Sequence, residues 1–440
     1  MIRRSASRIA AAAVVVVVVA FLTACTGGSP EGGRKWLGEQ SGIIATSVVS
    51  ETHEELLTTG IVRGELKPGL SASDLQTLVD TVGGYQAKHA NVSFELGLHD
   101  VDFAISDRVT NKREIGLWRV ALKAKKAING LVSSSDGEDK VSLTTLRPDA
   151  IAALTTIGGL KAELRIDAYA TRDEAVNGAT DDRDLVVDVP ADCHPADPDW
   201  AFAQTVPTRT DVQAANLALC DSLKLVAPPD ASLATIAPAL RAELDSTGVT
   251  LPVRLVSQPA NVSYARSIAV LPGVPSAFGV LAAAEKPDLR YDLAEDGTLT
   301  LRDAAQPVDA LISLLKATPG ADALPELDLY GSDVAVGGPL AALPALRETA
   351  LALDAASDTF GEVELTPAFG SVELEGTISD PPHVADAAAA LRASGVTQGR
   401  TFAVTYVAFQ VDIQDGIATL HDHYTDPHIA QSFVDAWNAG

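Results

Sequence analysis

Apolar residues recur with helical spacing in five segments of this 440-residue chain. In each segment apolar positions stand at i and i+3, and all but the second segment, which has Gly158, extend to i+7, a pattern typical of an amphipathic helix. The leading residues are 76, 82, 75 and 76 positions apart, so the pattern predicts one such helix per period of about 76 residues. The leading pairs are Leu75/Leu78, Ile151/Leu154, Leu233/Ile236, Val308/Leu311 and Val384/Ala387.

Each predicted helix follows a proline loop and has short alternating segments on both sides. Proline favours helix starts, and alternation of apolar and polar positions is typical of a strand. The prolines are Pro68, Pro148, Pro228, Pro307 and Pro381. The strands expected before the loops contain Leu66, Val141/Leu143, Leu223/Leu225, Leu299/Leu301 and Val372/Leu374, and those after the helices contain Phe94/Leu96, Leu164/Ile166, Val253/Leu255, Leu327/Leu329 and Val404/Tyr406.

A second helix is expected in every period. The segments are residues 118–128, 212–219, 277–284, 340–353 and 429–437. Residues 289–301 and 409–420 have the alternation and the glycine-containing turn of a β-hairpin ahead of a helix. We therefore expect a strand, strand, helix half-unit of about 37 residues to underlie the period.

The pattern predicts an α+β fold of tandem repeats, each with a strand, a helix, one or two strands and a helix, in which small antiparallel sheets carry helices on one face. An α+β chain can also show such periods by chance. The expected division is a signal peptide at 1–24, a lipidated cysteine and flexible tether at 25–40, and repeats at 41–130, 131–222, 223–288, 289–361 and 362–440, with an insertion at 171–209 in the second repeat.

The N-terminus has the pattern of an export signal. Arg3, Arg4 and Arg8 precede an unbroken run of 14 apolar residues at 9–22. A membrane-spanning helix needs about 20 apolar residues, so this run is better interpreted as a signal peptide than as a permanent span. The two adjacent arginines do not distinguish export by the Sec route from export by the Tat route.

The signal ends at Leu22-Thr23-Ala24-Cys25, which resembles the lipobox of bacterial lipoproteins. The resemblance implies that a diacylglyceryl group is added to the Cys25 sulfur and that the chain is cut just before this residue. The expected location is extracytoplasmic, on the outer face of the cytoplasmic membrane, with the membrane bound through the lipid on Cys25. The alternative is a plain secreted protein with a chance cysteine at this position.

Composition narrows the range of partners. The formal net charge of −25 repels nucleic acid and anionic lipid headgroups, so no nucleic-acid partner is expected. Aromatic residues are only 5% of the chain, so the cores must be packed mainly by Ala, Val and Leu. Alanine richness and a preference for arginine over lysine suggest a high-GC genome, which fits an actinobacterial lipoprotein.

Cys193 and Cys220 are the two cysteines after Cys25. Outside the membrane such a pair is expected to be oxidised, and a closed loop of about 28 residues contributes roughly 3 to 4 kcal/mol in the chain-entropy model. The disulfide would then join the insertion at 171–209 to a following helix that contains Cys220. Two buried thiols are the alternative.

Two stretches, at 289–315 (LRYDLAEDGTLTLRDAAQPVDALISLL) and at 372–394 (VELEGTISDPPHVADAAAALRAS), are similar to BON modules of bacterial envelope proteins. Gly376 matches the glycine that follows the second strand in that family, and Asp303 stands in its place in the other stretch. The resemblance implies binding to other components of the cell envelope and brings no catalytic residues.

Common catalytic motifs are missing from the chain after Cys25, and no cofactor is expected. His421, His423 and His428 are weak candidates for zinc ligands, but their place between a predicted strand and the last predicted helix suggests a solvent-exposed loop. The acidic residues of the insertion offer oxygen ligands for Ca²⁺ without the spacing of an EF-hand loop. These residues are Asp181, Asp182, Asp184, Asp188, Asp192, Asp197 and Asp199.

Three functions are open from the sequence. The first is a non-catalytic envelope lipoprotein whose tandem modules bind an envelope protein or a cell-wall partner. The second is an extracytoplasmic receptor that captures a small solute between modules. The third is a metal-dependent enzyme with its site in the loop from His421 to His428.

Overall fold

The computed structural model describes residues 29–54, 57–105, 108–124, 126–135, 138–177, 184–229, 231–257, 266–270, 275–284, 289–356, 360–367, 369–374, 384–393, 400–404, 409–423 and 427–440. The chain divides into two compact units. Unit 1 comprises Met1–Thr210 and Ala214–Leu223, and unit 2 comprises Asp211–Gln213 and Lys224–Gly440. Both units mix helices with strands, in agreement with the broad α+β class expected from the sequence.

Unit 1 alternates strands and helices along the chain. Its elements are α2 (Pro30–Gly38), β1 (Ile43–Glu54), β2 (Leu57–Leu66), α3 (Ala72–Gln86), β3 (Val92–Leu98), β4 (Val101–Ala104), α4 (Arg108–Ala121), β5 (Ala127–Ser135), β6 (Glu138–Leu146), α5 (Ala150–Ile157), β7 (Glu163–Tyr169), α6 (Arg172–Asn177), β8 (Leu185–Val189), α7 (Asp197–Thr205) and β9 (Ala214–Ala218).

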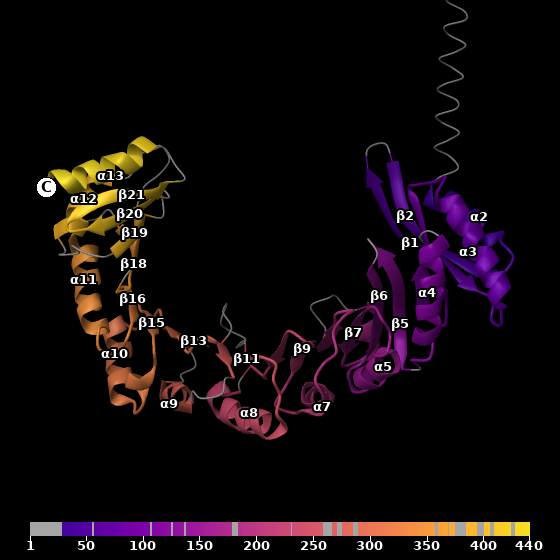
Figure 1. The fold of residues 1–440 in the computed structure, drawn as a ribbon, viewed down its shortest axis with the longest axis horizontal. Coiled ribbons are helices and arrows are strands. Elements are labelled where there is room, and N and C mark those ends of the chain that lie inside the picture. The colour runs from indigo at the N-terminus through magenta and orange to yellow at the C-terminus, as the bar shows by residue number, and fades with distance from the viewer. Residues whose placement is uncertain are drawn as a thin grey trace, which may run out of the picture. The chain divides into compact units, whose positions relative to one another are not determined.

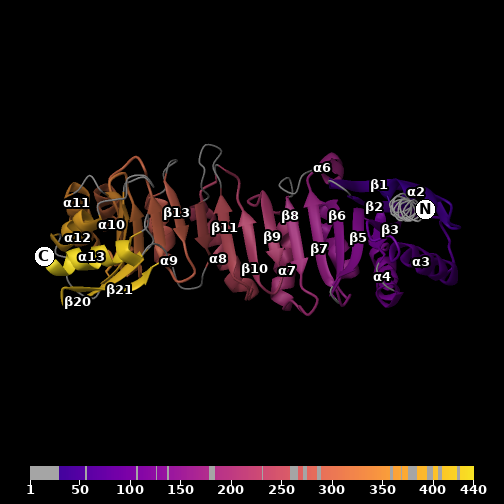
Figure 2. The same cartoon turned by 90° about the horizontal axis from the view of Figure 1, so that it is seen from above.

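Consecutive strands of unit 1 pair with each other, and the direction of pairing alternates (Figure 2). The pairs β1–β2, β3–β4, β5–β6 and β7–β8 are antiparallel. The pairs β2–β3, β4–β5, β6–β7 and β8–β9 are parallel. A parallel pair needs a crossover connection of a dozen or more residues, which α3, α4, α5 and α7 supply.

One face of the strands in unit 1 carries the core, and the crossover helices pack against it (Figure 1). In β6, Val141 and Leu143 are buried, and Ser142 between them is partly exposed. Leu154 and Ile157 of α5, which packs on β6 and β7, are also buried. The opposite face, here called the open face, therefore carries the side chains that alternate with the buried ones.

The segment expected to be a flexible tether is helical from Pro30 to Gly38. The Ser29 side chain caps this helix by accepting a hydrogen bond from the amide of Gly32, and proline occupies the first position. Leu37 is fully buried, and a Cβ on Gly64 of β2 would lie 2.8 Å from its Cδ2. A small residue in β2 thus lets an apparently polar segment dock on the sheet.

Unit 2 continues the alternation of strands and helices. Its elements are β10 (Ser222–Val226), which begins in unit 1, α8 (Leu233–Thr247), β11 (Val253–Ser257), β12 (Arg266–Ala269), α9 (Pro275–Ala284), β13 (Arg290–Leu293), β14 (Leu299–Arg302), α10 (Val308–Ala317), β15 (Leu327–Tyr330), β16 (Ala335–Gly338), α11 (Leu343–Ala356), β17 (Phe360–Leu365), β18 (Phe369–Leu374), α12 (Val384–Ala393), β19 (Arg400–Val404), β20 (Phe409–Gln414), β21 (Ile417–His423) and α13 (Pro427–Ala439).

Pairing in unit 2 follows the same rule until the last strand. The antiparallel pairs are β11–β12, β13–β14, β15–β16, β17–β18 and β19–β20. The parallel pairs are β12–β13, β14–β15, β16–β17 and β18–β19. The final pair, β20–β21, is antiparallel without a crossover, and α13 packs on β21 and α12.

The five predicted helices with apolar stripes are α3, α5, α8, α10 and α12, and most of their stripe residues are buried. Ile151 and Ile236 are only half-buried. The second stripe stops at Gly158 because α5 ends at Ile157 and Gly158 is its C-cap. No helix within the described residues combines the length and apolar character that a membrane span requires.

Some predictions from the sequence differ from the structure. Residues 212–219, expected to be a helix, contain strand β9, because Ala215 and Leu217 are buried while Asn216 between them is exposed. The expected insertion at 171–209 contains α6, β8 and the crossover helix α7, so it is part of the regular alternation. Division between repeats at 130/131 and 361/362 would cut β5 and β17.

Candidate functional site

The three candidate histidines do not converge in the structure. His421 lies in β21, not in a loop, and its Nδ1 is 2.9 Å from Asp412 Oδ2. His428 is exposed in the first turn of α13, and the His423 side chain lies outside the described residues, although its backbone belongs to β21. Among the residues that the structure describes, no group of three or more His, Cys, Asp or Glu side chains is placed to hold a metal ion.

Asp412 is the partner that the sequence did not identify for His421. Thr401 Oγ1 donates a hydrogen bond to Asp412 Oδ1 at 2.7 Å. The hydrogen bond from Thr401 lowers the pKa of the Asp412 carboxyl below its usual range, and His421 contributes to the same shift. Asp412 lies opposite Thr419 in the β20–β21 hairpin, and His421 falls at the irregularity of the same strand pair, so the contact depends on the strand register.

The acidic residues considered as Ca²⁺ ligands are dispersed. Asp188 lies on the open face of β8, whereas Asp199 is buried in α7. Asp192 and Asp197 are exposed, and Asp181 and Asp182 lie outside the described residues. Burial raises the pKa of Asp184 and Asp188, in each case against the effect of a nearby arginine.

Cys193 and Cys220 form a disulfide, with Cα atoms 6.0 Å apart, which is the pairing expected from the sequence. Cys220 lies in the turn that follows β9 and has a φ of 79°, so its expected place in a helix is wrong. The lipid-bearing candidate Cys25 and the family glycine Gly376 lie outside the described residues.

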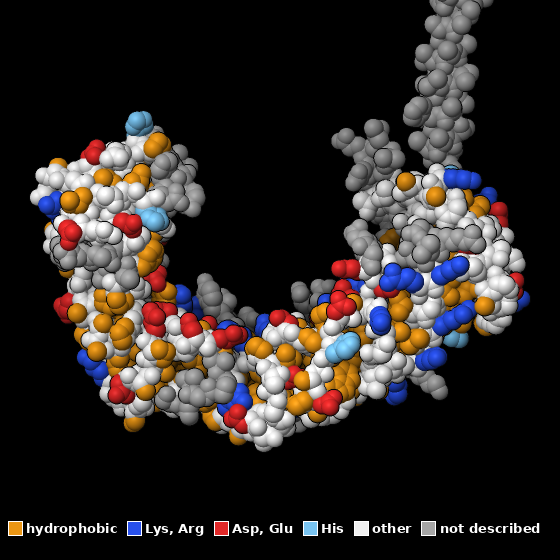
Figure 3. All heavy atoms as spheres, in the orientation of Figure 1, with side chains coloured by type: hydrophobic (Ala, Val, Ile, Leu, Met, Phe, Trp, Pro, Cys, Tyr) orange, Lys and Arg blue, Asp and Glu red, His pale blue; other side chains and the backbone are white. Residues whose placement is uncertain are grey.

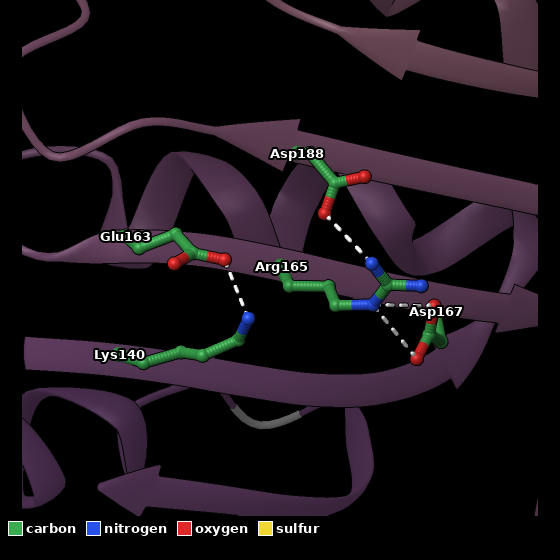
Figure 4. Close-up of polar contacts among 5 residues, drawn as sticks. All are labelled: Lys140, Glu163, Arg165, Asp167 and Asp188. Atoms are coloured by element: carbon green, nitrogen blue, oxygen red, sulfur yellow. Dashed lines mark hydrogen bonds and ion pairs between the residues drawn. The ribbon is translucent and has the colours of Figure 1, made fainter. Parts of the chain in front are cut away.

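Ion pairs cross the open face of unit 1 on β6, β7 and β8 (Figure 4). Lys140 Nζ lies 2.5 Å from Glu163 Oε1 on the neighbouring strand. Arg165 in β7 pairs with Asp167 of its own strand and with Asp188 of β8, both at 3.2 Å. Basic and acidic groups of three neighbouring strands thus pair with each other on a face that the crossover helices leave uncovered.

A hollow of about 520 Å³ lies on the same open face, lined mainly by residues of β1 to β6 and by α6. Arg63 Nε is 2.8 Å from Asp102 Oδ2, and its Nη2 is 3.5 Å from Asp100 Oδ1. Glu95 stands directly beside Arg63 in the parallel register of β2 and β3. Burial raises the pKa of Glu95, and the neighbouring Asp102 raises it further, while Arg63 opposes both effects.

Asp102 lines this hollow, and a glycine on the paired strand leaves the space that its side chain fills. Gly97 is its cross-strand partner in the register of β3 and β4. A Cβ on Gly97 would overlap Asp102 Oδ1 and lie 2.7 Å from the carbonyl oxygen of Val101. Burial raises the pKa of Asp102 above its ordinary value of 3.8, and Arg63 opposes this rise.

Unit 2 has its own polar groups on the alternating positions of its strands. Arg254 Nη1 lies 2.9 Å from Asp292 Oδ1 and 2.7 Å from Ser267 Oγ. The guanidinium carbon of Arg302 is 3.5 Å from the ring centroid of Tyr330. The Tyr330 hydroxyl donates to Glu364 at 2.9 Å, and burial followed by the charge of Glu364 raises the pKa of Tyr330 to about 12.

These polar groups are spread over successive strands, and the charges of neighbouring groups partly neutralise each other. The sequence signal for them was the polar half of each alternating strand, such as Arg165 and Asp167 between the buried Leu164, Ile166 and Ala168. The chain matches no protein-family model, no curated protein and no solved structure.

Proposed function

We propose that the protein is a non-catalytic lipoprotein of the cell envelope that binds an envelope protein or a cell-wall partner through its open sheet face. The ladder of Lys140, Glu163, Arg165 and Asp188 is the observation that supports this proposal most directly. Partly desolvated charges of both signs, presented on consecutive strands, give register and specificity to an interface.

We further propose that the chain is a tandem array of strand, strand, helix repeats, two of which make up each period of about 76 residues. The alternation of antiparallel and parallel pairs supports this arrangement in both units. Within each compact unit, an array of this kind enlarges the binding surface because every strand, strand, helix repeat contributes two strands to it.

Site-specific photo-crosslinking tests the binding proposal. A photoreactive residue at Asn216, exposed on the open face of β9, should give a crosslinked adduct in intact cells, whereas one at Thr155, exposed on the outside of α5, should not. Arg165→Glu should reduce the adduct from position 216. Equal crosslinking from both positions, or none from position 216, would contradict the proposal.

The lipid anchor is tested separately by Cys25→Ala. The variant should lose the lipid and leave the membrane fraction, and mass spectrometry of the released chain should detect no acyl group. A Cys25→Ala protein that remains fully in the membrane fraction after export would count against the lipobox interpretation.

A receptor for a small solute is the second candidate, supported by the 520 Å³ hollow, which lies within the usual range of about 300 to 1,000 Å³ for ligand sites. Leu131→Arg would fill the hollow, whereas crosslinking from Asn216 should persist if the partner is extended. If a solute raises the melting temperature of the wild type but not that of the Leu131→Arg variant, the receptor hypothesis is favoured.

A further inference from the structure

The charge of one helix in unit 1 is opposite to that of the whole chain. Residues 108–126, which include α4, contain seven basic residues and one acidic residue, in a protein of net charge −25. The acidic residue, Glu114, is fully buried, so it does not offset the basic side chains at the surface. The cations of this segment therefore form a local exception to an acidic surface.

Five of the cations whose side chains the structure describes are exposed, and they are called the α4 stripe below. Lys112 and Arg119 lie seven positions apart, on one side of the helix, and Lys123 follows four positions later in the terminal turn. The other side of α4 is buried, with Ile115 and Trp118 in the core. The α4 stripe consists of Lys112, Arg113, Arg119, Lys123 and Lys126.

Among the residues that the structure describes, internal partners pair with two members of the α4 stripe. Arg113 Nη2 is 2.6 Å from the buried Asp139 Oδ2, and Lys126 Nζ is 3.0 Å from Asp149 Oδ1. Lys112, Arg119 and Lys123 form no ion pair with any residue that the structure describes. Figure 3 shows Lys and Arg side chains gathered over the part of unit 1 that contains α4.

The short spacing between Cys25 and the first described helix indicates what lies close to unit 1. Cys25 is four positions before Ser29, where the first helix of unit 1 is capped. Four extended residues span at most about 14 Å. A lipid on Cys25 would therefore hold unit 1 against the headgroups of the bilayer.

Screening by salt makes the local charge of the α4 stripe, not the net charge of the chain, important for contact with the bilayer. At physiological ionic strength the Debye length is about 8 Å, so acidic groups elsewhere on the chain contribute little at the α4 stripe. A basic segment close to an anionic membrane gains about 1 kcal/mol per charge, which is about fivefold in binding.

We propose that the α4 stripe is a second membrane contact, which binds anionic lipid headgroups when the lipid on Cys25 holds unit 1 at the bilayer. The proposal rests on the lipid anchor proposed above. The stripe would fix the orientation of unit 1 on the membrane and leave the open face of its sheet available to a partner.

Chemical attachment replaces the natural lipid in the test. The mature chain from Cys25 is coupled through its single free thiol to a maleimide lipid, because Cys193 and Cys220 are bonded to each other. Acylation by a neutral amine-reactive ester is then followed at each lysine by mass spectrometry, on phosphatidylcholine vesicles with and without phosphatidylglycerol.

On phosphatidylglycerol vesicles, labelling of Lys112 and Lys123 should slow at least about fivefold and recover in 1 M salt. Lys316, exposed on α10 of unit 2, is the internal control and should label at the same rate on both vesicles. Arg119→Glu should weaken the protection of both stripe lysines without altering Lys316.

Equal labelling of the stripe lysines on the two vesicles would overturn the proposal. Protection by soluble polyphosphate without protection by the vesicles would also overturn it, and would identify a polyanionic polymer as the partner. Since attachment is chemical, either result leaves the natural lipid anchor and the binding role of the open face to be judged by their own experiments.

Discussion

Each unit places an aspartate opposite a glycine across a β-hairpin, but the surroundings of the two aspartates differ. Asp102 faces Gly97 in unit 1, and Asp328 faces Gly337 in unit 2. In unit 1 the carboxylate pairs with the guanidinium of Arg63 at 2.8 Å. In unit 2 it accepts a 3.5 Å hydrogen bond from the Thr300 hydroxyl.

Both sites place a glycine opposite the buried aspartate, but the group that pairs with the carboxylate differs. Burial raises the pKa of both aspartates, because a carboxylate loses hydration when it lies flat over a neighbouring strand. A missing Cβ on the glycine provides the space in each case. The partner in unit 1 is the charged Arg63 of β2, which lies beyond the glycine's strand β3, whereas the partner in unit 2 is the neutral hydroxyl of Thr300 on β14, directly beside Asp328. Strand pairing therefore sets where the aspartate can be buried, and the partner comes from a different place in the sheet in each unit.

Adding a methyl group at each glycine should have the largest effect on stability. The size of the loss should differ between the glycine of unit 1 and the glycine of unit 2. Gly97→Ala places a Cβ against both Asp102 Oδ1 and the Val101 carbonyl oxygen, so we expect a loss of about 3 kcal/mol of unfolding free energy. Gly337→Ala meets Asp328 Oδ1 at 2.5 Å, with Thr366 Cγ2 at 3.1 Å, and should cost about 1 kcal/mol because side chains can move. Urea denaturation of both variants measures the difference; equal losses would show that the two glycines are equivalent.

Removal of each aspartate's partner should have the next largest effect. Arg63→Met leaves the buried Asp102 carboxylate unpaired and should cost about 2 kcal/mol at pH 7. Thr300→Val, which breaks a long neutral hydrogen bond, should cost about 0.5 kcal/mol.

The pH dependence of Arg63→Met gives an independent check. The pKa of Asp102 is already raised in the folded protein, and loss of Arg63 raises it further. A raised carboxyl pKa destabilises the fold above that pKa, and this cost disappears as the pH falls and the carboxyl is protonated. The deficit of Arg63→Met relative to wild type should therefore be smaller at pH 5 than at pH 7; a larger deficit at pH 5 would exclude the charge explanation.

Tyr330→Phe tests the neutral chemistry of unit 2 and should cost about 1 kcal/mol, because Glu364 loses a hydrogen-bond donor. Ultraviolet titration should detect one tyrosine with a pKa of about 12 in the wild type, absent from the variant. Tyr291→Phe is the matched control, and the group with the high pKa should persist in it. If the group with a pKa of about 12 persists in Tyr330→Phe, another tyrosine gives the signal.

The smallest effect is expected at the exposed pair of His421 and Asp412. His421→Ala should change the unfolding free energy by at most about 0.5 kcal/mol, since ion pairs open to solvent contribute little. His428→Ala should be equally mild. Zinc that stays bound to the wild type through dialysis and is lost from the His421→Ala variant would revive the enzyme hypothesis.

Local apolar patterns predicted much of the helical core. Leu75, Leu240 and Leu315 are buried as their helical spacing indicated. The disulfide between Cys193 and Cys220 followed from their number and their expected environment. These features depend on residues close in sequence or on simple counting, so a single sequence contains them.

The polar face could not be predicted in the same way. Arg63 and Asp102 are brought together by two consecutive strand pairings, and a shift of one residue in either pairing would move one of them to the other face. The helix at Pro30–Gly38 was missed because much of its composition is that of a flexible linker and its large apolar residues contact distant parts of the chain. Trp36 stacks on Tyr85 of α3, and Leu37 lies against Gly64 of β2. Register and tertiary docking, not local propensity, decided both cases.

Strand order also has a consequence for how the chain folds. Among the paired strands of the described residues, parallel partners such as Gly60 and Val92 are 32 positions apart, and hairpin partners are closer. The entropy cost of loop closure grows only slowly with loop length, and topologies dominated by local contacts fold faster than those with long-range pairing. Each hairpin and its helix can add to a neighbour already in place as the chain emerges, so assembly can begin before the whole polypeptide is available.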